Sequence, residues 1–341
     1  MRAAVTPAPM GQIAISEVPD PERRLGEIIV RVHAASVNWL DRAVYEGTAM
    51  GDAASFPLVQ GIGAAGVVET GMGPYPAGMR VVVKPTIACR RCRWCRQGRL
   101  ADCIDATTFG IHRQGGFADL LAVPRSNLLP LPEGVSLVEA AAAAHTHPIA
   151  LRMLRSVGAP IRRATVMVTG AGGTLGTAAA QLASILGANV IAVANSDQAQ
   201  DIGASEVVDE SLRGPAFKEA IWESTDGVGV DVVIETTGSA AMVEDGMAVL
   251  ARGGAMVLAA ARPNSRLTLD LPSLYRNGHR VIGISESSQV EMSDAFGMLA
   301  EHDIHPVVSA RYPLDRTQAA MNATLDRDRI GNIVIQMNDE G

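Results

Sequence analysis

The chain has 341 residues, of which 48% are hydrophobic and 19% are charged, and its formal net charge is −7. This length predicts two domains, and the apolar fraction is sufficient for packed cores. The negative charge argues against a nucleic acid or an anionic membrane as a partner. No apolar run approaches the roughly 20 residues that span a bilayer. The N-terminus has a strand-like pattern without the apolar core of a signal peptide, so we expect a cytoplasmic protein.

All four cysteines of the chain lie in one short segment, CRRCRWCRQGRLADC. They are Cys89, Cys92, Cys95 and Cys103. Four thiolates at this spacing can close a tetrahedron around one Zn²⁺, and a site with four cysteine ligands has no open position for substrate. We therefore expect a structural zinc. Unliganded thiols and an iron–sulfur cluster are the alternatives, although the common iron–sulfur signatures have other spacings.

The same segment is rich in arginine. Its arginines are Arg90, Arg91, Arg93, Arg96 and Arg99. Four thiolates on Zn²⁺ leave a formal charge near −2, and nearby arginines would offset it and donate to the sulfurs. The alternative is that these side chains bind an anionic substrate or a partner subunit.

Residues 164–194 have the pattern of a strand, a glycine turn, a helix and a second strand. An apolar run, Val166–Val168, leads into the glycine turn, and Val190–Val193 forms the second strand. Glycines allow the backbone to approach a pyrophosphate, and the helix N-terminus binds its charge. The predicted cofactor contacts in this turn are Gly170, Gly172, Gly173, Thr174, Leu175 and Gly176. A glycine-rich turn without a ligand is the alternative.

Further apolar runs predict the rest of a doubly wound parallel sheet of six strands. They are Glu206–Asp209, Asp231–Glu235, Ala255–Ala260 and Val281–Ser285. The second strand is followed by Asn195 and Ser196, where an acid would bind the ribose 2′-hydroxyl of NAD. The missing acid favours NADP(H) over NAD(H), with Asn195 and Ser196 as contacts, although the next basic residue is Arg213.

Several segments together resemble the medium-chain dehydrogenase/reductase superfamily. In chain order they are SVNWLDRAVYEG, PLVQGIGAAGVVE, the four-cysteine segment, GGFADLLAVPRSNLLPLPEGV, the glycine turn, DVVIETTG and IGNIVIQM. The resemblance implies an α/β fold with a GroES-like, mostly-β catalytic domain at 1–147 and 289–341 and a Rossmann domain at 148–288. It also implies an NAD(P)-dependent oxidoreductase, a small-molecule substrate, a homodimer or homotetramer, and cofactor contacts at Thr236 and Gly238.

The positions that hold the catalytic zinc in the alcohol dehydrogenases of this superfamily read Asn38, Ile62 and His145 here. A catalytic zinc needs about three protein ligands, so we predict that this chain has no catalytic zinc. The pair Asn38 and Asp41 instead resembles the zinc-free, quinone-oxidoreductase-like members.

Four residues are candidates for the catalytic site. They are Asn38, Asp41, Tyr45 and His145. Asn38 would donate to the substrate oxygen or to the loop backbone, and His145 would act as a general acid or lie packed at a helix start. Tyr45 would donate a proton or shape the pocket, and Asp41 would orient the loop or the cofactor.

The resulting prediction is an NAD(P)H-dependent oxidoreductase without catalytic zinc. It would reduce an activated C=C bond, in an enone or enoyl compound, or a quinone, by hydride transfer. One alternative is a carbonyl or imine reductase that uses protein hydrogen-bond donors. A second alternative is a nicotinamide-binding protein without catalytic activity.

Overall fold

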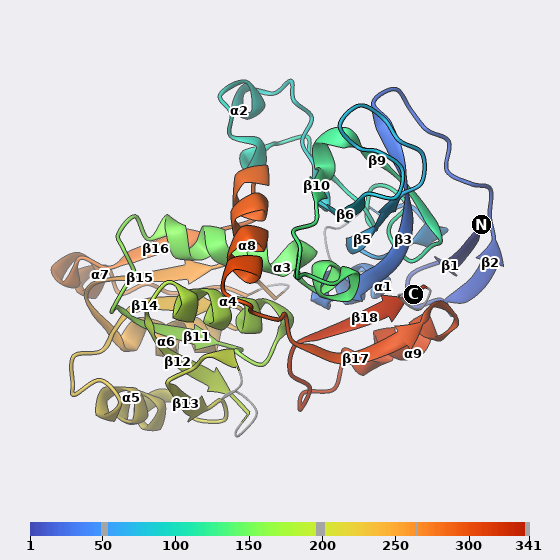
Figure 1. The fold of residues 1–341 in the computed structure, drawn as a ribbon. Helices are drawn as coiled ribbons and strands as arrows, with labels where there is room; N and C mark the ends of the chain where they lie inside the picture. The colour runs from blue at the N-terminus through green and yellow to red at the C-terminus, as the bar shows by residue number, and fades with distance from the viewer. Residues whose placement is uncertain (49–53, 196–201, 263–264, 338–341) are drawn as a thin grey trace. The chain divides into compact units, whose positions relative to one another are not determined.

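A computed structural model describes residues 1–48, 54–195, 202–262 and 265–337. The chain forms two compact units (Figure 1). We call Met1–Pro148 with Glu286–Gly341 the GroES-like unit, and Ile149–Ser285 the Rossmann unit. These limits lie within three residues of the domain limits expected from the sequence. In the described part of the chain, no helix is long and apolar enough to cross a membrane.

The Rossmann unit is built on a parallel sheet of six strands in the order β13-β12-β11-β14-β15-β16. The strands are β11 (Thr165–Thr169), β12 (Asn189–Ala194), β13 (Glu206–Asp209), β14 (Val230–Glu235), β15 (Leu250–Leu258) and β16 (Arg280–Gly283). The inner strand β11 buries Val166, Met167 and Val168 completely, as expected for a strand covered on both faces. The predicted doubly wound sheet is confirmed.

Four helices belong wholly to the Rossmann unit among the described residues. They are α4 (Thr174–Ile185), α5 (Gly214–Glu223), α6 (Ala240–Ala248) and α7 (Leu271–Asn277). One buried cluster joins Phe217 and Ile221 of α5 with Met242 of α6 and Met167 of β11. These apolar side chains hold α5 and α6 against the sheet.

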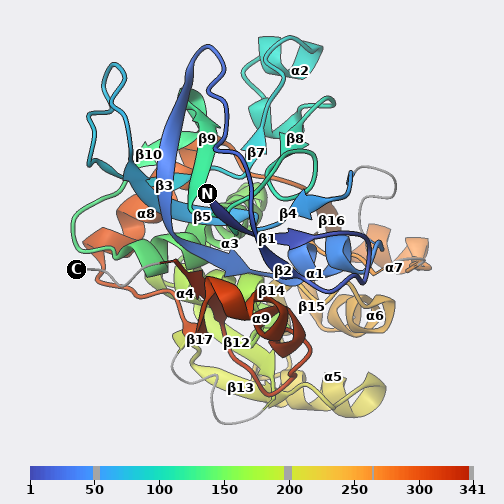
Figure 2. The same cartoon turned by 90° about the vertical axis from the view of Figure 1, so that its right-hand side faces the viewer.

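The larger sheet of the GroES-like unit has seven strands, in the order β10-β6-β5-β3-β18-β17 with β9 also paired to β3. Its strands are β3 (Glu27–Val37), β5 (Gly63–Val68), β6 (Arg80–Val83), β9 (Leu120–Pro124), β10 (Leu128–Pro130), β17 (Val308–Pro313) and β18 (Asn332–Gln336). Strand β18, labelled in Figure 1, comes from the last part of the chain and pairs antiparallel with β3, which is also labelled in Figure 2. This pairing explains why the unit needs both ends of the sequence.

Two smaller sheets complete the β-structure of the unit. The first contains β1 (Arg2–Thr6), β2 (Ala14–Glu17) and β4 (Leu58–Val59), and the second contains β7 (Thr86–Ile87) and β8 (Thr107–Thr108). The helices are α1 (Trp39–Tyr45), α2 (Arg93–Arg96), α8 (Gln289–Glu301) and α9 (Thr317–Ala323). Helix α3 (Leu137–Ser156) begins in this unit and continues past the limit at Pro148.

Candidate functional site

Three neighbouring strands of the GroES-like sheet end at one edge. Ser36 of β3 pairs with Gly63 of β5, and Ala64 of β5 pairs with Val83 of β6. Because both pairings are antiparallel, the end of β3, the start of β5 and the end of β6 meet there. The residues next to these strand ends are Asn38, Ile62 and Lys84. We call these three residues the strand-end row.

Helix α3 lies directly against this edge. A Cβ atom on Gly63 would lie 2.9 Å from the backbone oxygen of Ala141 and 3.5 Å from the Cβ of Ala144. Only a glycine allows such close approach, so the small residue at 63 sets the distance between helix and strand. The contact brings the next residue of α3, His145, to the strand-end row.

Asn38 is the N-cap of helix α1 and is buried. Its side-chain oxygen accepts hydrogen bonds from the backbone N–H groups of Leu40 at 2.9 Å and Asp41 at 3.3 Å. Its amide nitrogen, Nδ2, is buried and has no hydrogen-bond partner among the described residues. The oxygen therefore stabilises the helix start, and the amide nitrogen is a free donor at the predicted substrate position.

Asp41 is fully buried and holds two segments together. One carboxylate oxygen accepts from the backbone N–H of Asn38 at 3.1 Å, which completes a capping box. The other oxygen accepts from Gly61 and Ile62 at 3.1 Å each. Burial raises the pKa of Asp41 from 3.8 to about 7, although these N–H donors act in the opposite direction.

Ile62 is fully buried in a small apolar cluster. The cluster also contains Val44, Leu58 and Ile111. The hydrocarbon side chain offers no metal ligand, so the position that resembles a zinc ligand has become part of the core.

His145 is half-buried on α3. Burial lowers the pKa of its imidazole, the Glu286 carboxylate raises that pKa, and the Lys84 ammonium lowers it again. The balance is a lowered pKa, so the ring is neutral at pH 7. A neutral imidazole can donate one hydrogen bond and accept another.

Tyr45 lies at the other end of helix α1 from Asn38. Its ring is part of the main apolar cluster, and Arg42 lies 5.5 Å from the ring centroid. Its hydroxyl accepts a hydrogen bond from Gln318 at 3.4 Å. A helix rises about 1.5 Å per residue, so seven residues separate Tyr45 from Asn38 by about 10 Å. These contacts suit packing better than proton transfer.

The glycine turn of the Rossmann unit has the geometry of a phosphate site. Gly170 has φ +65°, and a Cβ atom on Gly176 would lie 2.1 Å from the Gly170 oxygen. Gly173 is the N-cap of α4, and its position has no side-chain cap, so the first N–H groups of this twelve-residue helix can receive a ligand. Of the other predicted contacts, Gly172 lies in the same turn, and Thr174 and Leu175 are the first two residues of α4. These features fit the pyrophosphate of a dinucleotide.

A second loop meets the glycine turn from β14. The Thr236 hydroxyl donates to the backbone oxygen of Thr169 at 2.7 Å, and a Cβ atom on Gly170 would lie 3.0 Å from that hydroxyl. Gly238 has φ +65° and donates its N–H to the buried Glu235 carboxylate at 3.1 Å. The loop that carries Thr236 and Gly238 is therefore fixed beside the glycine turn.

The four cysteines converge in the lobe around α2. Their sulfur atoms all lie within 4.8 Å of one another, and the Cys89 and Cys95 sulfurs are 3.9 Å apart. Tetrahedral Zn²⁺ with bonds of about 2.3 Å needs sulfurs about 3.8 Å apart. The backbone N–H of Cys95 donates to the Cys92 sulfur and lowers the pKa of that thiol to about 6. The donor set and spacing fit the predicted structural zinc.

The arginines of this lobe are all exposed. Arg99 pairs with Asp102 at 2.7 Å, and Arg91 lies 3.9 Å from Asp105. Two guanidinium groups lie over the ring of Trp94, with Arg93 at 4.4 Å and Arg99 at 4.2 Å from its centroid. Cation–π contacts and local ion pairs therefore hold three of the arginines within the lobe itself.

Two family models match the chain. The alcohol dehydrogenase GroES-like domain matches residues 24–133, and the zinc-binding dehydrogenase domain matches residues 174–301. The crystal structure of an NAD-dependent alcohol dehydrogenase is 30% identical, with a TM-score of 0.90, over 99% of this chain and 100% of its own. The chain belongs to the zinc-type alcohol dehydrogenase-like branch of the medium-chain dehydrogenase/reductase superfamily.

Curated relatives with different activities cover the whole length of this superfamily member. The acryloyl-coenzyme A reductase of Sulfurisphaera tokodaii is 24% identical over 98% of this chain and 100% of its own. The alcohol dehydrogenase of Geobacillus stearothermophilus is 27% identical over 99% of this chain and 100% of its own. The chain is therefore an NAD(P)-dependent oxidoreductase of the medium-chain dehydrogenase/reductase type.

The predicted contacts with the adenosine ribose, Asn195 and Ser196, follow strand β12. Asn195 follows the last residue of β12 and is exposed, and Ser196 lies outside the described residues. Asp209 ends the neighbouring strand β13 and pairs in register with Ala194. An acid therefore lies one strand away from the expected position, which leaves the preference for NADP(H) as a prediction.

The sequence did not predict a role for Lys84 of the strand-end row or for its partner Glu286. The ammonium of Lys84 lies 3.2 Å from a carboxylate oxygen of Glu286, and both side chains are largely covered, with 9% and 15% exposed. Lys84 follows β6, and Glu286 lies 202 residues later. The sequence did contain one sign that Lys84 is unusual. The chain has 29 lysines and arginines, and Lys84 is one of two lysines among them.

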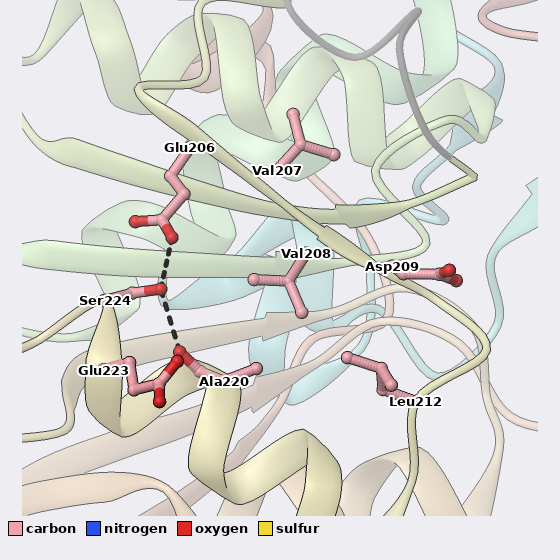
Figure 3. Close-up of a pocket in the computed structure, with 8 residues that line it drawn as sticks. All are labelled: Glu206, Val207, Val208, Asp209, Leu212, Ala220, Glu223 and Ser224. Atoms are coloured by element: carbon pink, nitrogen blue, oxygen red, sulfur yellow. Dashed lines mark hydrogen bonds between the residues drawn. The ribbon is translucent and has the colours of Figure 1, made fainter.

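A shallow hollow of about 440 Å³ lies on the Rossmann unit beside β13 and α5 (Figure 3). Its lining includes the carboxylates of Glu206, Asp209 and Glu223, and Ser224 donates to Glu206. None of the predicted cofactor contacts lines it. Three carboxylates would repel a dinucleotide phosphate, so this hollow is not the cofactor site.

Proposed function

We propose that this dehydrogenase homologue is an NAD(P)H-dependent reductase of activated C=C bonds, in enones, enoyl compounds or quinones, that works without a catalytic zinc. The observation that carries the proposal is the composition of the strand-end row with His145. A buried hydrocarbon, a helix-capping amide and one imidazole stand at the three positions that resemble zinc ligands.

The argument against a catalytic zinc is one of ligand number. Ile62 has no ligand atom, and the Asn38 oxygen is already used by the start of α1. His145 alone cannot supply the three protein ligands of a catalytic zinc. Without that Lewis acid, little polarises a simple ketone or lowers the pKa of an alcohol. The favoured acceptor is therefore one whose double bond is already activated by a conjugated carbonyl.

The residues of the site suit that chemistry. A bound reduced nicotinamide supplies a hydride for the β-carbon of the acceptor. Negative charge then develops on the carbonyl oxygen, and the unpartnered Nδ2 of Asn38 is the donor that would hold it. His145, neutral at pH 7, would donate or accept one further hydrogen bond.

The comparisons give support of two kinds. The acryloyl-coenzyme A reductase relative is named for an activated double bond, which is the leading class of acceptor here. The alcohol dehydrogenase relatives are named for alcohols, and they are the reason to test carbonyl compounds and imines as the alternative acceptors.

We extend the proposal to the remaining expectations from the sequence. NADP(H) is the favoured cofactor, because no acid follows β12 at Asn195. The lobe of four cysteines holds one structural Zn²⁺ per chain. The protein acts on a small molecule as a cytoplasmic homodimer or homotetramer.

The test is turnover across a panel of acceptors with NADPH and with NADH. Conjugated enones, enoyl thioesters and quinones should be reduced, whereas saturated ketones, aldehydes and imines should be reduced slowly or not at all. Reduction of carbonyl compounds or imines alone would replace the proposal by its alternative. Cofactor binding without any reduction would leave a nicotinamide-binding protein without catalytic activity.

A further inference from the structure

We propose that Lys84 is a catalytic residue of this site: it donates the proton that completes the reduction, and Glu286 positions it. This inference rests on the proposed function, because it concerns the second half of the same reaction. It starts from a pair of charges that neither the sequence motifs nor the predicted mechanism uses.

The position of Lys84 follows from strand register. Val83, the last residue of β6, pairs with Ala64 of β5, so the next residue stands at the edge where the strand-end row lies. The backbone there is fixed, because the Lys84 N–H donates to the Asn127 oxygen at 2.7 Å. The amide of Asn127 in turn donates to the Lys84 oxygen at 3.0 Å. Lys84 is thus fixed in the same row as Asn38, whose amide nitrogen is a free donor.

The Lys84 ammonium is largely shielded from solvent, but it has only one acceptor among the described residues. It lies 3.2 Å from Glu286, and Glu286 is the one acceptor that the described residues offer it. An ammonium has three N–H donors, so two remain for a ligand. A buried ion pair is weak evidence of a stabilising device, because removing two charges from water costs about as much as their attraction returns. A role in the site explains the pair better than a role in folding.

The choice of lysine is unusual in this chain. Lysines occur only at positions 84 and 218, against 27 arginines. Lys218 is half-buried on α5 and lies over the ring of Trp222 at 4.2 Å. A guanidinium keeps its proton in proteins, whereas an ammonium can release one. Almost all basic residues of this chain are arginines. The strand-end row nevertheless contains a lysine, the basic side chain that can donate its proton.

The proposed step balances as follows. The acceptor gains a hydride at its β-carbon, its C=C electron pair moves to give an enolate, and the nicotinamide is oxidised. Asn38 donates a hydrogen bond to the enolate oxygen. An N–H bond of Lys84 breaks, its proton forms the new C–H bond at the α-carbon, and the amine becomes neutral. Solvent water then returns the proton to Lys84. The titratable groups near Lys84 are its ion-pair partner Glu286 and His145, whose imidazole is neutral at pH 7.

Three variants test the assignment. Lys84→Met removes the charge and the proton, Lys84→Arg keeps the charge but is too weak an acid to donate its proton, and Lys218→Met is the matched control. We expect kcat to fall by about 100-fold or more in both Lys84 variants, as for loss of a general acid, and to stay within about twofold of wild type in Lys218→Met. Wild-type turnover in Lys84→Arg or Lys84→Met would overturn the proposal.

The stereochemistry of the product separates proton donation from a structural role. With an acceptor that carries a methyl group on its α-carbon, a fixed donor delivers the proton to one face. We expect a single stereoisomer from the wild type and a mixture from the residual turnover of Lys84→Met, because water can then protonate either face. A single stereoisomer from Lys84→Met would overturn the proposal. The double variant Lys84→Met, Glu286→Gln leaves no unpaired charge and repeats the test if the single variant does not fold.

A last readout does not depend on turnover. Labelling with ¹³C-lysine gives two ε-methylene NMR signals, which Lys218→Met assigns. Addition of oxidised cofactor with a saturated carbonyl product should shift the Lys84 signal and leave the Lys218 signal unchanged. An unshifted Lys84 signal would overturn the inference. If the wild type reduces no activated double bond, the proposed function fails by itself, and the NMR shift alone then decides whether Lys84 contacts the ligand.

Discussion

Asp41 and Ile62 are 21 residues apart, and a 3.1 Å hydrogen bond joins the Ile62 N–H to the Asp41 carboxylate. The same carboxylate also caps the turn at Asn38. One buried acid therefore fixes two of the three positions that resemble zinc ligands, although none of them is held by a metal in the proposed enzyme. In the proposed enzyme, these backbone hydrogen bonds to Asp41 would hold the two positions in place of a metal.

This relationship predicts how stability depends on pH. Burial raises the pKa of Asp41 to about 7 in the folded chain, so folding favours its protonated form. The stability from this group is fully present below the unfolded pKa of about 3.9 and is lost as the pH rises through about 7. The expected loss is about 1 kcal/mol per pH unit between these values.

The variant Asp41→Asn isolates that effect. The variant loses some folding stability at every pH, because its single amide oxygen cannot accept from all the N–H groups that donate to the carboxylate. This loss of stability does not depend on pH. Urea unfolding at pH 4.5 and pH 7.5 should therefore show that the stability difference between wild type and Asp41→Asn shrinks as the pH rises. A difference that is constant with pH would contradict the raised pKa.

Asn38 has two roles that substitution can separate. Asn38→Ser keeps a capping oxygen but lacks the amide donor, so we expect kcat to fall by about 100-fold with little change in Tm. Asn38→Ala also loses the cap and should be less stable by about 1 kcal/mol. Steady-state kinetics and thermal unfolding check both. Full activity in Asn38→Ser would mean that Nδ2 does not hold the substrate oxygen.

The zinc lobe gives a prediction about metal content. Elemental analysis of the purified protein should find one zinc per chain, bound by the four cysteines. Cys95→Ser should lose the metal, because it removes a buried ligand of the four, and should lower the stability of the lobe. Two zinc ions per chain would contradict the predicted loss of the catalytic site, and none would contradict the structural site.

The cofactor preference can be reversed at one position. Asn195→Asp places an acid after β12, where it would hydrogen-bond the ribose hydroxyls of NADH and repel the 2′-phosphate of NADPH. We expect the ratio of kcat/KM for NADPH over NADH to fall by about tenfold or more. Asn195→Ala serves as the neutral control. A wild type that already prefers NADH would contradict the predicted cofactor.

Local pattern was enough to predict much of the molecule. The Rossmann strands follow from apolar runs, and the cysteine cluster follows from spacing, because both depend on residues that are close in sequence. The glycine turn is also a local pattern, although its helix begins at Thr174, before the last glycine of the predicted turn.

The rest depends on contacts between distant segments. Lys84 and Glu286 are 202 residues apart, and only the register of β6 and the start of α8 bring them together. Tyr45 was a candidate for the same site as Asn38, but the two residues stand at opposite ends of α1. The Tyr45 ring packs in the main apolar cluster. The sequence left two roles open for Asn38, a hydrogen bond to the loop backbone and one to the substrate oxygen. In the structure its side-chain oxygen caps α1, and its Nδ2 is available for the other role.

The contacts of Trp94 with Arg93 and Arg99 have a practical consequence. The indole lies one residue before Cys95, so its fluorescence should report whether the metal lobe is assembled. The chain has two other tryptophans, Trp39 at the start of α1 and Trp222 on α5. Each of the three stands in a different part of the fold, which makes single-tryptophan versions of this protein optical probes for the lobe, the start of α1 and the Rossmann unit in turn.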